Sequence, residues 1–153
     1  MDQIDRRILG FLQSDATASL DDISERVHLS RNACWRRIQR LESDGVITKR
    51  VAMLDPAALN LALSVFIVVR AGRHSAGWAE SFRAALADFP EITGAYRTAG
   101  DIDYILRARV PDVAAYDRLY QKLIARVDMV DVSASFVMEE IKDTHELPLD
   151  YLR

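Results

Sequence analysis

The chain has 153 residues, half of them hydrophobic, and a formal net charge of −3. This length suits one large domain or two small ones, and no apolar run approaches the roughly 20 residues that a membrane-spanning helix needs. The single cysteine, Cys34, excludes an intramolecular disulfide framework and, together with a charged N-terminus that lacks a signal-peptide pattern, indicates a location in the reducing cytoplasm.

The charge is divided unevenly along the chain. Residues 1–50 hold nine Lys or Arg against eight Asp or Glu, a net charge of +1, whereas residues 51–153 hold eleven against fifteen, a net charge of −4. Phosphate binding depends on the local field more than on the total charge. The first part of the chain is therefore suited to nucleic acid, while the acidic remainder argues against a protein that coats DNA along its whole surface.

The first segment is predicted to form an amphipathic helix that begins near Asp2. Its apolar positions recur at helical spacing, and they are Ile4, Ile8, Leu9, Phe11 and Leu12. We expect this helix to pack behind the next two helices as a member of a small bundle.

Residues 20–41, LDDISERVHLSRNACWRRIQRL, predict two short helices joined by a tight turn that contains His28. Ser19 and Ser30 stand at the two N-cap positions, and Asp22 completes an approximate capping box with Ser19. The residues that the second helix turns inward are Cys34, Ile38 and Leu41. This arrangement is typical of a helix-turn-helix.

The opposite face of the second helix is basic, because four arginines and no acid lie between Arg31 and Arg40. Arginine binds phosphates or the O6 and N7 edge of guanine. A solvated basic face on a surface hairpin is the alternative, but caps, turn and basic face together favour a DNA-recognition helix. The residues expected to bind double-stranded DNA are Ser30, Arg31, Asn32, Trp35, Arg36, Gln39, Arg40, Lys49 and Arg50.

Gly45 is suited to the left-handed position that ends a helix. Residues 46–54 favour β structure and predict a wing or an extended connector, in which Lys49 and Arg50 either touch phosphate or are simply solvated. Asp55-Pro56 ends this stretch. We therefore assign residues 1–50 to a (winged) helix-turn-helix domain, 51–61 to a linker strand or turn, and 62–153 to a second domain.

The second domain alternates strands and helices. Strands are predicted at residues 61–69, 92–98, 103–110 and 130–141, with helices after Ser75 and from Pro111-Asp112. The inward positions of the second of these helices are Val113, Tyr116, Leu119, Tyr120, Leu123 and Val127. The order βαββαβ is the ferredoxin-like split motif, so the predicted fold class is α+β.

The first strand of this domain is apolar on both faces. Leu63, Val65, Ile67 and Val69 alternate with Phe66 and Val68. Two helices cover only one face of a four-stranded sheet, and an uncovered apolar face is an unusually large exposed patch. The simplest cover is a second copy of the chain, so we expect a homodimer whose paired recognition helices address a roughly palindromic operator.

Four segments in series resemble the Lrp/AsnC (feast/famine) family of prokaryotic transcriptional regulators. They are IDRRIL at 4–9, WRRIQRLESDGVI at 35–47, GDIDYILRARVPD at 100–112 and VMEEIKDT at 137–144. The match follows the family order over nearly the whole chain. It implies an N-terminal DNA-binding domain and a C-terminal effector domain that dimerises, assembles further, commonly to octamers, and binds amino acids in clefts between dimers.

The resemblance also implies an effector-binding loop around Gly100. A glycine turn exposes backbone N–H groups that hold a carboxylate, and a nearby aspartate takes an α-ammonium. The alternative is that Gly100-Asp101 is only a hairpin turn and Asp103 a solvated edge residue. The expected effector-binding residues are Thr98, Gly100, Asp101, Asp103, Tyr104, Ser133, Ser135, Val137 and Met138, and no cofactor or metal is expected.

Two positions depart from the family pattern. His28 stands where many relatives have glycine, and histidine is among the residues enriched at positive φ. We interpret His28 as a turn residue, with pH sensing as the alternative. Trp35 replaces smaller residues, and either contacts the sugar-phosphate backbone or packs against the first helix.

Two further functions deserve comparison with an amino-acid-responsive, sequence-specific regulator. An architectural protein that compacts DNA would bind with little sequence preference, and a haem-pathway decarboxylase-like enzyme of the same architecture would have lost the basic helix face. The sequence has neither a phosphate loop nor a nucleophile elbow, and its histidines, His28, His74 and His145, show no metal-ligand spacing. We therefore expect a regulator and no enzymatic activity.

Overall fold

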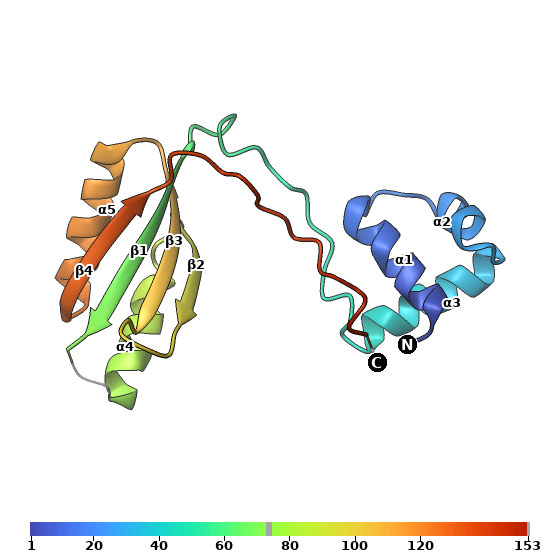
Figure 1. Cartoon of the computed structure of the whole chain (residues 1–153), viewed down its shortest axis with the longest axis horizontal. Helices are drawn as coiled ribbons and strands as arrows, with labels where there is room; N and C mark the ends of the chain where they lie inside the picture. The colour runs from blue at the N-terminus through green and yellow to red at the C-terminus, as the bar shows by residue number, and fades with distance from the viewer. Residues whose placement is uncertain (73–74, 153) are drawn as a thin grey trace. The chain divides into compact units, whose positions relative to one another are not determined.

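The computed structural model describes residues 1–72 and 75–152, which form two compact units (Figure 1). The first unit comprises Met1–Met53 and the segment from Lys142 to the C-terminus, and the second comprises Leu54–Ile141. The segment from Lys142 onward was expected in the second domain. It belongs to the first unit instead, because it packs on the helices there.

Three helices build the first unit: α1 (Gln3–Ser14), α2 (Leu20–Val27) and α3 (Arg31–Ser43). The Ser19 hydroxyl accepts from the Asp22 N–H and the Asp22 carboxylate accepts from the Ser19 N–H, so the expected capping box is confirmed. Ser30 caps α3 by accepting from the Ala33 N–H. The buried core is Ile8, Leu9, Leu12, Ile23, Val27, Cys34, Ile38 and Leu41, as the helical spacing predicted.

His28 ends α2 in the left-handed conformation, with φ 56° and ψ 47°. The Leu29 N–H then donates to the carbonyl of Ser24, which closes the helix with a Schellman-type bond. The interpretation of His28 as a turn residue at positive φ is therefore confirmed.

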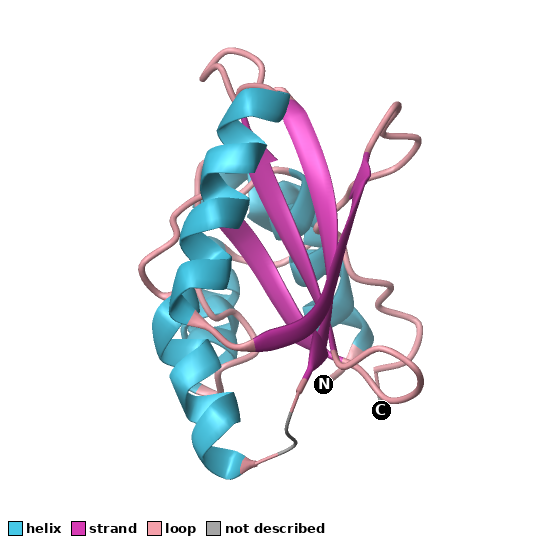
Figure 2. Cartoon of the chain, turned by 90° about the vertical axis from the view of Figure 1, so that its left-hand side faces the viewer, coloured by secondary structure: helices cyan, strands magenta, loops and turns pink. Residues whose placement is uncertain are grey.

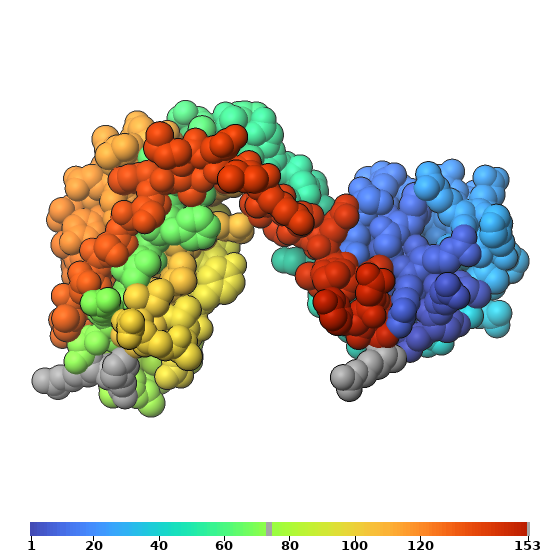
Figure 3. Space-filling view, viewed as in Figure 1, coloured from blue at the N-terminus to red at the C-terminus, as the bar shows by residue number. Residues whose placement is uncertain are grey.

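The C-terminal segment lies against α1, as the red and blue surfaces of Figure 3 show. Leu149 and Leu152 pack on the core of the first unit. The Gln13 side chain both donates to the carbonyl and accepts from the N–H of Leu147, at 3.1 Å and 2.7 Å. Apolar contacts and hydrogen bonds from a side chain to the backbone thus both hold this segment to the first unit.

The chain that follows α3 is extended and forms neither helix nor strand from Thr48 to Asp55. Gly45 takes φ +71°, and the N–H groups of Val46 and Ile47 both donate to the carbonyl of Leu41. Of the two possibilities raised for this stretch, the structure has the extended connector and no wing strand.

The second unit contains β1 (Leu63–Ala71), α4 (Ala76–Leu86), β2 (Ile92–Arg97), β3 (Tyr104–Val110), α5 (Val113–Arg126) and β4 (Met129–Phe136). The strands form one antiparallel sheet in the order β2-β3-β1-β4. Both helices lie on one face of this sheet (Figure 2), and the core between them includes Val65, Ile67, Phe82, Leu106 and Leu123. The predicted α+β ferredoxin-like order is confirmed.

Two details of the second unit differ from the prediction. The last strand ends at Phe136 rather than residue 141, because β1 begins at Leu63 and its last bond to this segment is from the Val137 N–H to the Ser64 carbonyl. Val113 was expected to point inward, but it stands in the first turn of α5, two turns before the buried Leu119, and is exposed.

Candidate functional site

The outward face of α3 carries an exposed polar row. Asn32, Arg36 and Gln39 recur at spacings of four and three residues, so they lie along one side of the helix, opposite the buried Cys34 and Ile38. This is the geometry that a major-groove reading helix requires.

Trp35 flanks this row and is 52% exposed. It belongs to neither buried cluster, and the ring contacts found in the described residues do not include it. About half of the Trp35 surface is therefore open to an external partner, and its contact with the sugar-phosphate backbone stays a prediction.

Asp5 of α1 holds two arginines of α3. The Arg40 Nη2 lies 2.6 Å from Asp5 Oδ2, and the Arg37 Nη1 lies 2.8 Å from Asp5 Oδ1 and 2.7 Å from Asp2 Oδ2. Asp5 is only 1% exposed, so this carboxylate is neutralised from α3 inside the unit. Arg40, which was expected to face the groove, pairs with Asp5 through Nη2, while its side chain is 52% exposed, so its contact with DNA stays a prediction.

The same ion pairs and hydrogen bonds shift the pKa values of Asp2 and Arg37. The Asp5 backbone N–H, followed by the Arg37 guanidinium, lowers the pKa of Asp2. The Asp5 carboxylate, followed by that of Asp2, raises the pKa of Arg37. Both shifts favour the charged forms, so the ion pairs between α1 and α3 persist through the neutral range.

Three further arginines of the first unit differ in whether an acidic side chain pairs with them. Arg31 pairs with Asp21 at 3.4 Å between two exposed side chains, and Arg50 pairs with Glu42 at 2.8 Å. Within the described chain Arg36 has no carboxylate partner. It lines a hollow of about 370 Å³ together with Leu29, Ala33, Arg37 and Arg40. Arg31, Arg37 and Arg40 of α3 are thus paired with acidic side chains, whereas no acidic side chain of the described first unit neutralises Arg36.

The effector loop between β2 and β3 is held by its own residues. The Thr98 hydroxyl donates to the Ile102 carbonyl, and the Thr98 N–H donates to the Asp103 carbonyl at 2.9 Å. Gly100 has φ +123°, a conformation that L side chains rarely adopt, so the turn requires glycine. Asp101 is exposed beside it.

Asp103 is not a solvated edge residue. Its Oδ2 accepts from the Ala71 N–H at 2.9 Å, and its own N–H donates to the Val69 carbonyl. The carboxylate therefore ties the loop to the end of β1.

The remaining effector-binding candidates do not converge on one cavity of a single chain. Ser133 and Ser135 pair with Val68 and Phe66 and lie on the sheet face that no helix covers. Tyr104 lies on the helix-covered face, where its ring packs 4.7 Å from that of Phe82. Val137 and Met138 line a separate hollow of about 240 Å³ with Ser64 and Arg109.

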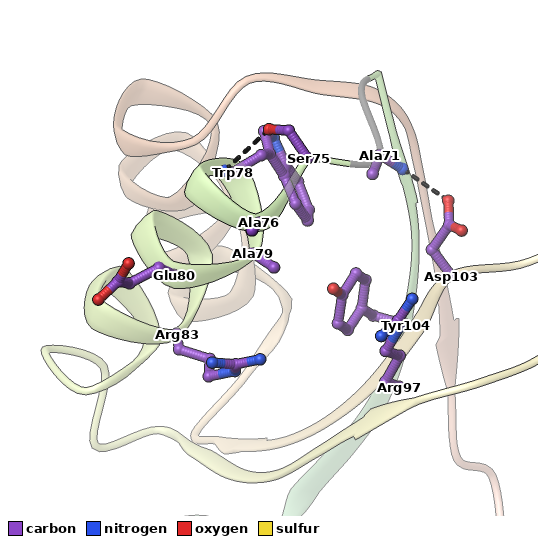
Figure 4. Close-up of a pocket in the computed structure, with 10 residues that line it drawn as sticks. All are labelled: Ala71, Ser75, Ala76, Trp78, Ala79, Glu80, Arg83, Arg97, Asp103 and Tyr104. Atoms are coloured by element: carbon purple, nitrogen blue, oxygen red, sulfur yellow. Dashed lines mark hydrogen bonds between the residues drawn. The ribbon is translucent and has the colours of Figure 1, made fainter.

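A larger cavity of about 530 Å³ contains two of the candidates, Asp103 and Tyr104 (Figure 4). Its other polar lining includes Arg83 of α4 and Arg97 of β2, neither of which the sequence analysis selected. No local motif marks these arginines; only the packing of α4 over the sheet brings them together.

Metal-ligand clusters and membrane-spanning helices are both absent from residues 1–72 and 75–152. No group of three or more His, Cys, Asp or Glu there is placed to hold a metal ion, and no helix there is long and apolar enough to cross a membrane. His74 lies outside the described residues.

Two family descriptions match the chain. Residues 1–48 match a winged helix-turn-helix DNA-binding domain, and residues 64–147 match the Lrp/AsnC ligand binding domain. Together these segments contain α1–α3 and the sheet of the second unit except for Leu63 at the start of β1.

Similar proteins agree with this assignment. The glutamate uptake regulatory protein of Zymomonas mobilis is 49% identical over 97% of this chain and 91% of its own length, and the DNA-binding transcriptional activator DecR of Escherichia coli is 40% identical over 98% and 99%. A solved AsnC family transcriptional regulator from Agrobacterium tumefaciens is 49% identical with a TM-score of 0.97 over the full length of both chains. A regulator from Neisseria meningitidis, solved with L-Met, is 34% identical over 100% of this chain and 99% of its own, with a TM-score of 0.95. The chain therefore belongs to the Lrp/AsnC family of DNA-binding transcriptional regulators.

Proposed function

We propose that this protein is an amino-acid-responsive regulator that reads a specific DNA sequence through α3 as a homodimer or higher oligomer. The observation that carries the proposal is the exposed row of Asn32, Arg36 and Gln39, with Arg36 lacking a carboxylate partner in the described chain. Asparagine and arginine are the side chains that pair bidentately with adenine and guanine in the major groove.

The open sheet face supports a dimer. Phe66 and Tyr96 lie on this face and are 41% and 55% exposed, and Val68 and Ile105 adjoin them in register. A second copy of the chain is the proposed cover, and it would also pair two recognition helices across a two-fold axis. Assembly beyond the dimer to an octamer is a proposal from the family resemblance.

The effector proposal rests on the loop after β2. Gly100 at positive φ exposes backbone N–H groups to a carboxylate, and Asp101 is exposed beside them to accept an ammonium. The Neisseria meningitidis regulator was solved with L-Met, which supports an amino acid as the class of effector. Ser133 and Ser135 of the open face remain candidates for a pocket completed by another subunit. We further propose a cytoplasmic role on DNA and no catalysis.

The DNA-binding proposal is tested by selecting duplexes from a random-sequence pool and comparing the selected duplex with random DNA at one salt concentration. A specific regulator binds the selected duplex at least about a thousandfold more tightly. Equal affinity for both would instead support the architectural, DNA-compacting function, because the phosphate contribution is independent of sequence.

Two variants connect this test to the residues. Arg36→Ala is expected to weaken binding to the selected duplex by at least about tenfold, whereas Arg118→Ala, which removes an exposed arginine of α5, leaves affinity unchanged. Asp101→Ala is expected to leave DNA binding intact and to abolish the effect of the amino acid that raises the melting temperature most in a screen of all twenty. A wild-type response in Asp101→Ala would refute the loop as the effector site.

A further inference from the structure

The cavity of about 530 Å³ in the second unit lies between α4 and the adjoining ends of β1, β2 and β3, on the helix-covered side of the sheet. Figure 4 shows Tyr104 at its centre, with Arg83 directed toward it from α4 and Arg97 beside it on β2. Ser133, Ser135 and Asp101 are not among its lining residues.

The two arginines of this cavity are not neutralised from within it. Neither Arg83 nor Arg97 makes an ion pair with any described residue, and both side chains are exposed. The cavity also contains two carboxylates, but that of Glu80 points away on the far side of α4 and that of Asp103 is turned to the Ala71 N–H (Figure 4). Two guanidinium groups from separate elements therefore face the same space without a counter-ion.

The phenol of Tyr104 adds a neutral donor. Its ring packs against those of Phe82 and Trp78, at centroid distances of 4.7 Å and 5.6 Å, and these two rings stack on each other at 4.9 Å. Trp78 is itself anchored, because its Nε1–H donates to the Asp128 carbonyl at 2.6 Å. The Tyr104 hydroxyl has no hydrogen-bond partner among the residues described, so its O–H is available to a ligand in the cavity.

The N-terminus of α4 adds further positive potential to the cavity. Ser75 caps the helix by accepting from the Trp78 N–H, and Ser75 and Ala76 both line the cavity. The positive end of an eleven-residue helix thus adjoins the two arginines. The helix N-terminus, the two guanidinium groups and the Tyr104 O–H therefore all favour a negatively charged ligand in this cavity.

We propose that this cavity binds a small dicarboxylate, with one carboxylate on Arg83 and the other on Arg97 and the Tyr104 hydroxyl. Guanidinium groups match carboxylates with paired hydrogen bonds, and each arginine has a fork of donors to offer. The site is separate from the Gly100–Asp101 loop, and it goes beyond the DNA-binding function proposed above.

The chain offers a direct readout of binding. It contains two tryptophans, and Trp35 lies in the first unit, so Trp35→Phe leaves Trp78 as the reporter inside the cavity wall. Titration of the full-length Trp35→Phe chain with L-glutamate or L-aspartate is expected to change Trp78 fluorescence saturably. L-glutamine, which has the same shape but one carboxylate fewer, is expected to bind at least about tenfold more weakly. An affinity for succinate comparable to that for L-glutamate would support the proposal, because succinate offers the same two carboxylates to the arginines.

Side-chain variants in the same background locate the ligand. Arg83→Gln and Arg97→Gln are each expected to raise the Kd for L-glutamate at least about tenfold, and Tyr104→Phe to raise it by about three- to tenfold. Arg118→Gln is the matched control with one exposed arginine removed elsewhere, and it is expected to bind as the parent does.

Three results would overturn the proposal. They are no saturable signal with any dicarboxylate, equal affinity for glutamate and glutamine, or parental affinity in both arginine variants. Asp101→Ala separates this proposal from the effector loop, because it is expected to leave the Trp78 titration unchanged. If Asp101→Ala abolishes the titration while Arg83→Gln does not, the ligand binds at the loop, and the dicarboxylate site is wrong although the amino-acid response stands.

Discussion

Arg40 reaches from α3 to the carboxylate of Asp5 in α1, 35 residues earlier, with 2.6 Å between Nη2 and Oδ2. Because Asp5 is buried and Arg37 binds its second oxygen, the pair fixes the angle at which α3 packs on α1. Asp5, Arg37 and Arg40 therefore help to orient the helix that carries Asn32, Arg36 and Gln39.

Asp5→Asn is expected to lower the free energy of unfolding of the first unit by about 1.5–3 kcal/mol, the usual contribution of hydrogen bonds to charged groups. Urea unfolding followed by circular dichroism measures this loss. The control is Asp131→Asn, because Asp131 pairs with Arg70 at 3.7 Å between exposed side chains and such pairs contribute less than about 1 kcal/mol. Equal losses in both variants would contradict the role assigned to Asp5.

His28→Val is expected to destabilise the first unit by about 1–2 kcal/mol, because a β-branched side chain is disfavoured in the left-handed conformation that ends α2. His28→Gly is the matched comparison, since glycine adopts this conformation without strain, and its stability is expected to lie within about 1 kcal/mol of the parent. The melting temperatures of the parent and the two variants measure these differences in stability. A valine variant as stable as the glycine variant would show that the positive φ carries no cost here.

Acid is expected to destabilise the first unit. The Asp5 N–H, the Thr17 hydroxyl and the Ser19 hydroxyl are the leading causes that lower the pKa of Asp2, Asp15 and Asp22, respectively, from the ordinary value of 3.8. A folded-state pKa below the unfolded value stabilises the fold above the unfolded pKa, and that stabilisation is lost as the pH falls through the folded pKa.

The loss should therefore begin as the pH falls to about 4 and deepen on further acidification. Helix content measured across this range checks it. Asp22→Asn should be less stable than the parent at neutral pH and should lose less on acidification, so parallel curves for the two proteins would refute the assignment.

Phe66→Glu is expected to separate the proposed dimer into single chains, because it places a charge on the open sheet face where a second copy would exclude water. Sedimentation velocity measures the mass in solution. Lys122→Glu makes a charge change of the same direction on the exposed side of α5, and it should leave the oligomer unchanged. A Phe66→Glu protein with the parental mass would exclude this face as the interface.

Local signals predicted most of the secondary structure. Ser19, Ser30, Ser75 and Asp112 each accept from an N–H three residues later, and each stands at a helix start that could be predicted from the sequence. The succession βαββαβ followed from the alternation of predicted strands and helices along the chain. These features depend on residues close together in the chain.

What the sequence did not predict depends on residues far apart. Asp5 forms a capping box with the nearby Asp2, but Arg37 and Arg40 come into contact with it only when α3 packs on α1. The cavity lined by Arg83 and Arg97 likewise exists only once α4 packs over the sheet. The site assignment around Gly100 came from a family resemblance and stays a prediction.

The attachment of the C-terminal segment to α1 has a consequence for local unfolding. The segment that carries Leu149 and Leu152 forms no helix or strand in the described residues, and few of its side chains pack on the first unit. Such a segment opens at a lower free energy than the helices beneath it. Amide hydrogens near Leu147 should therefore exchange with deuterium well before those in the middle of α1, and each opening would transiently wet one side of the bundle that carries the reading helix.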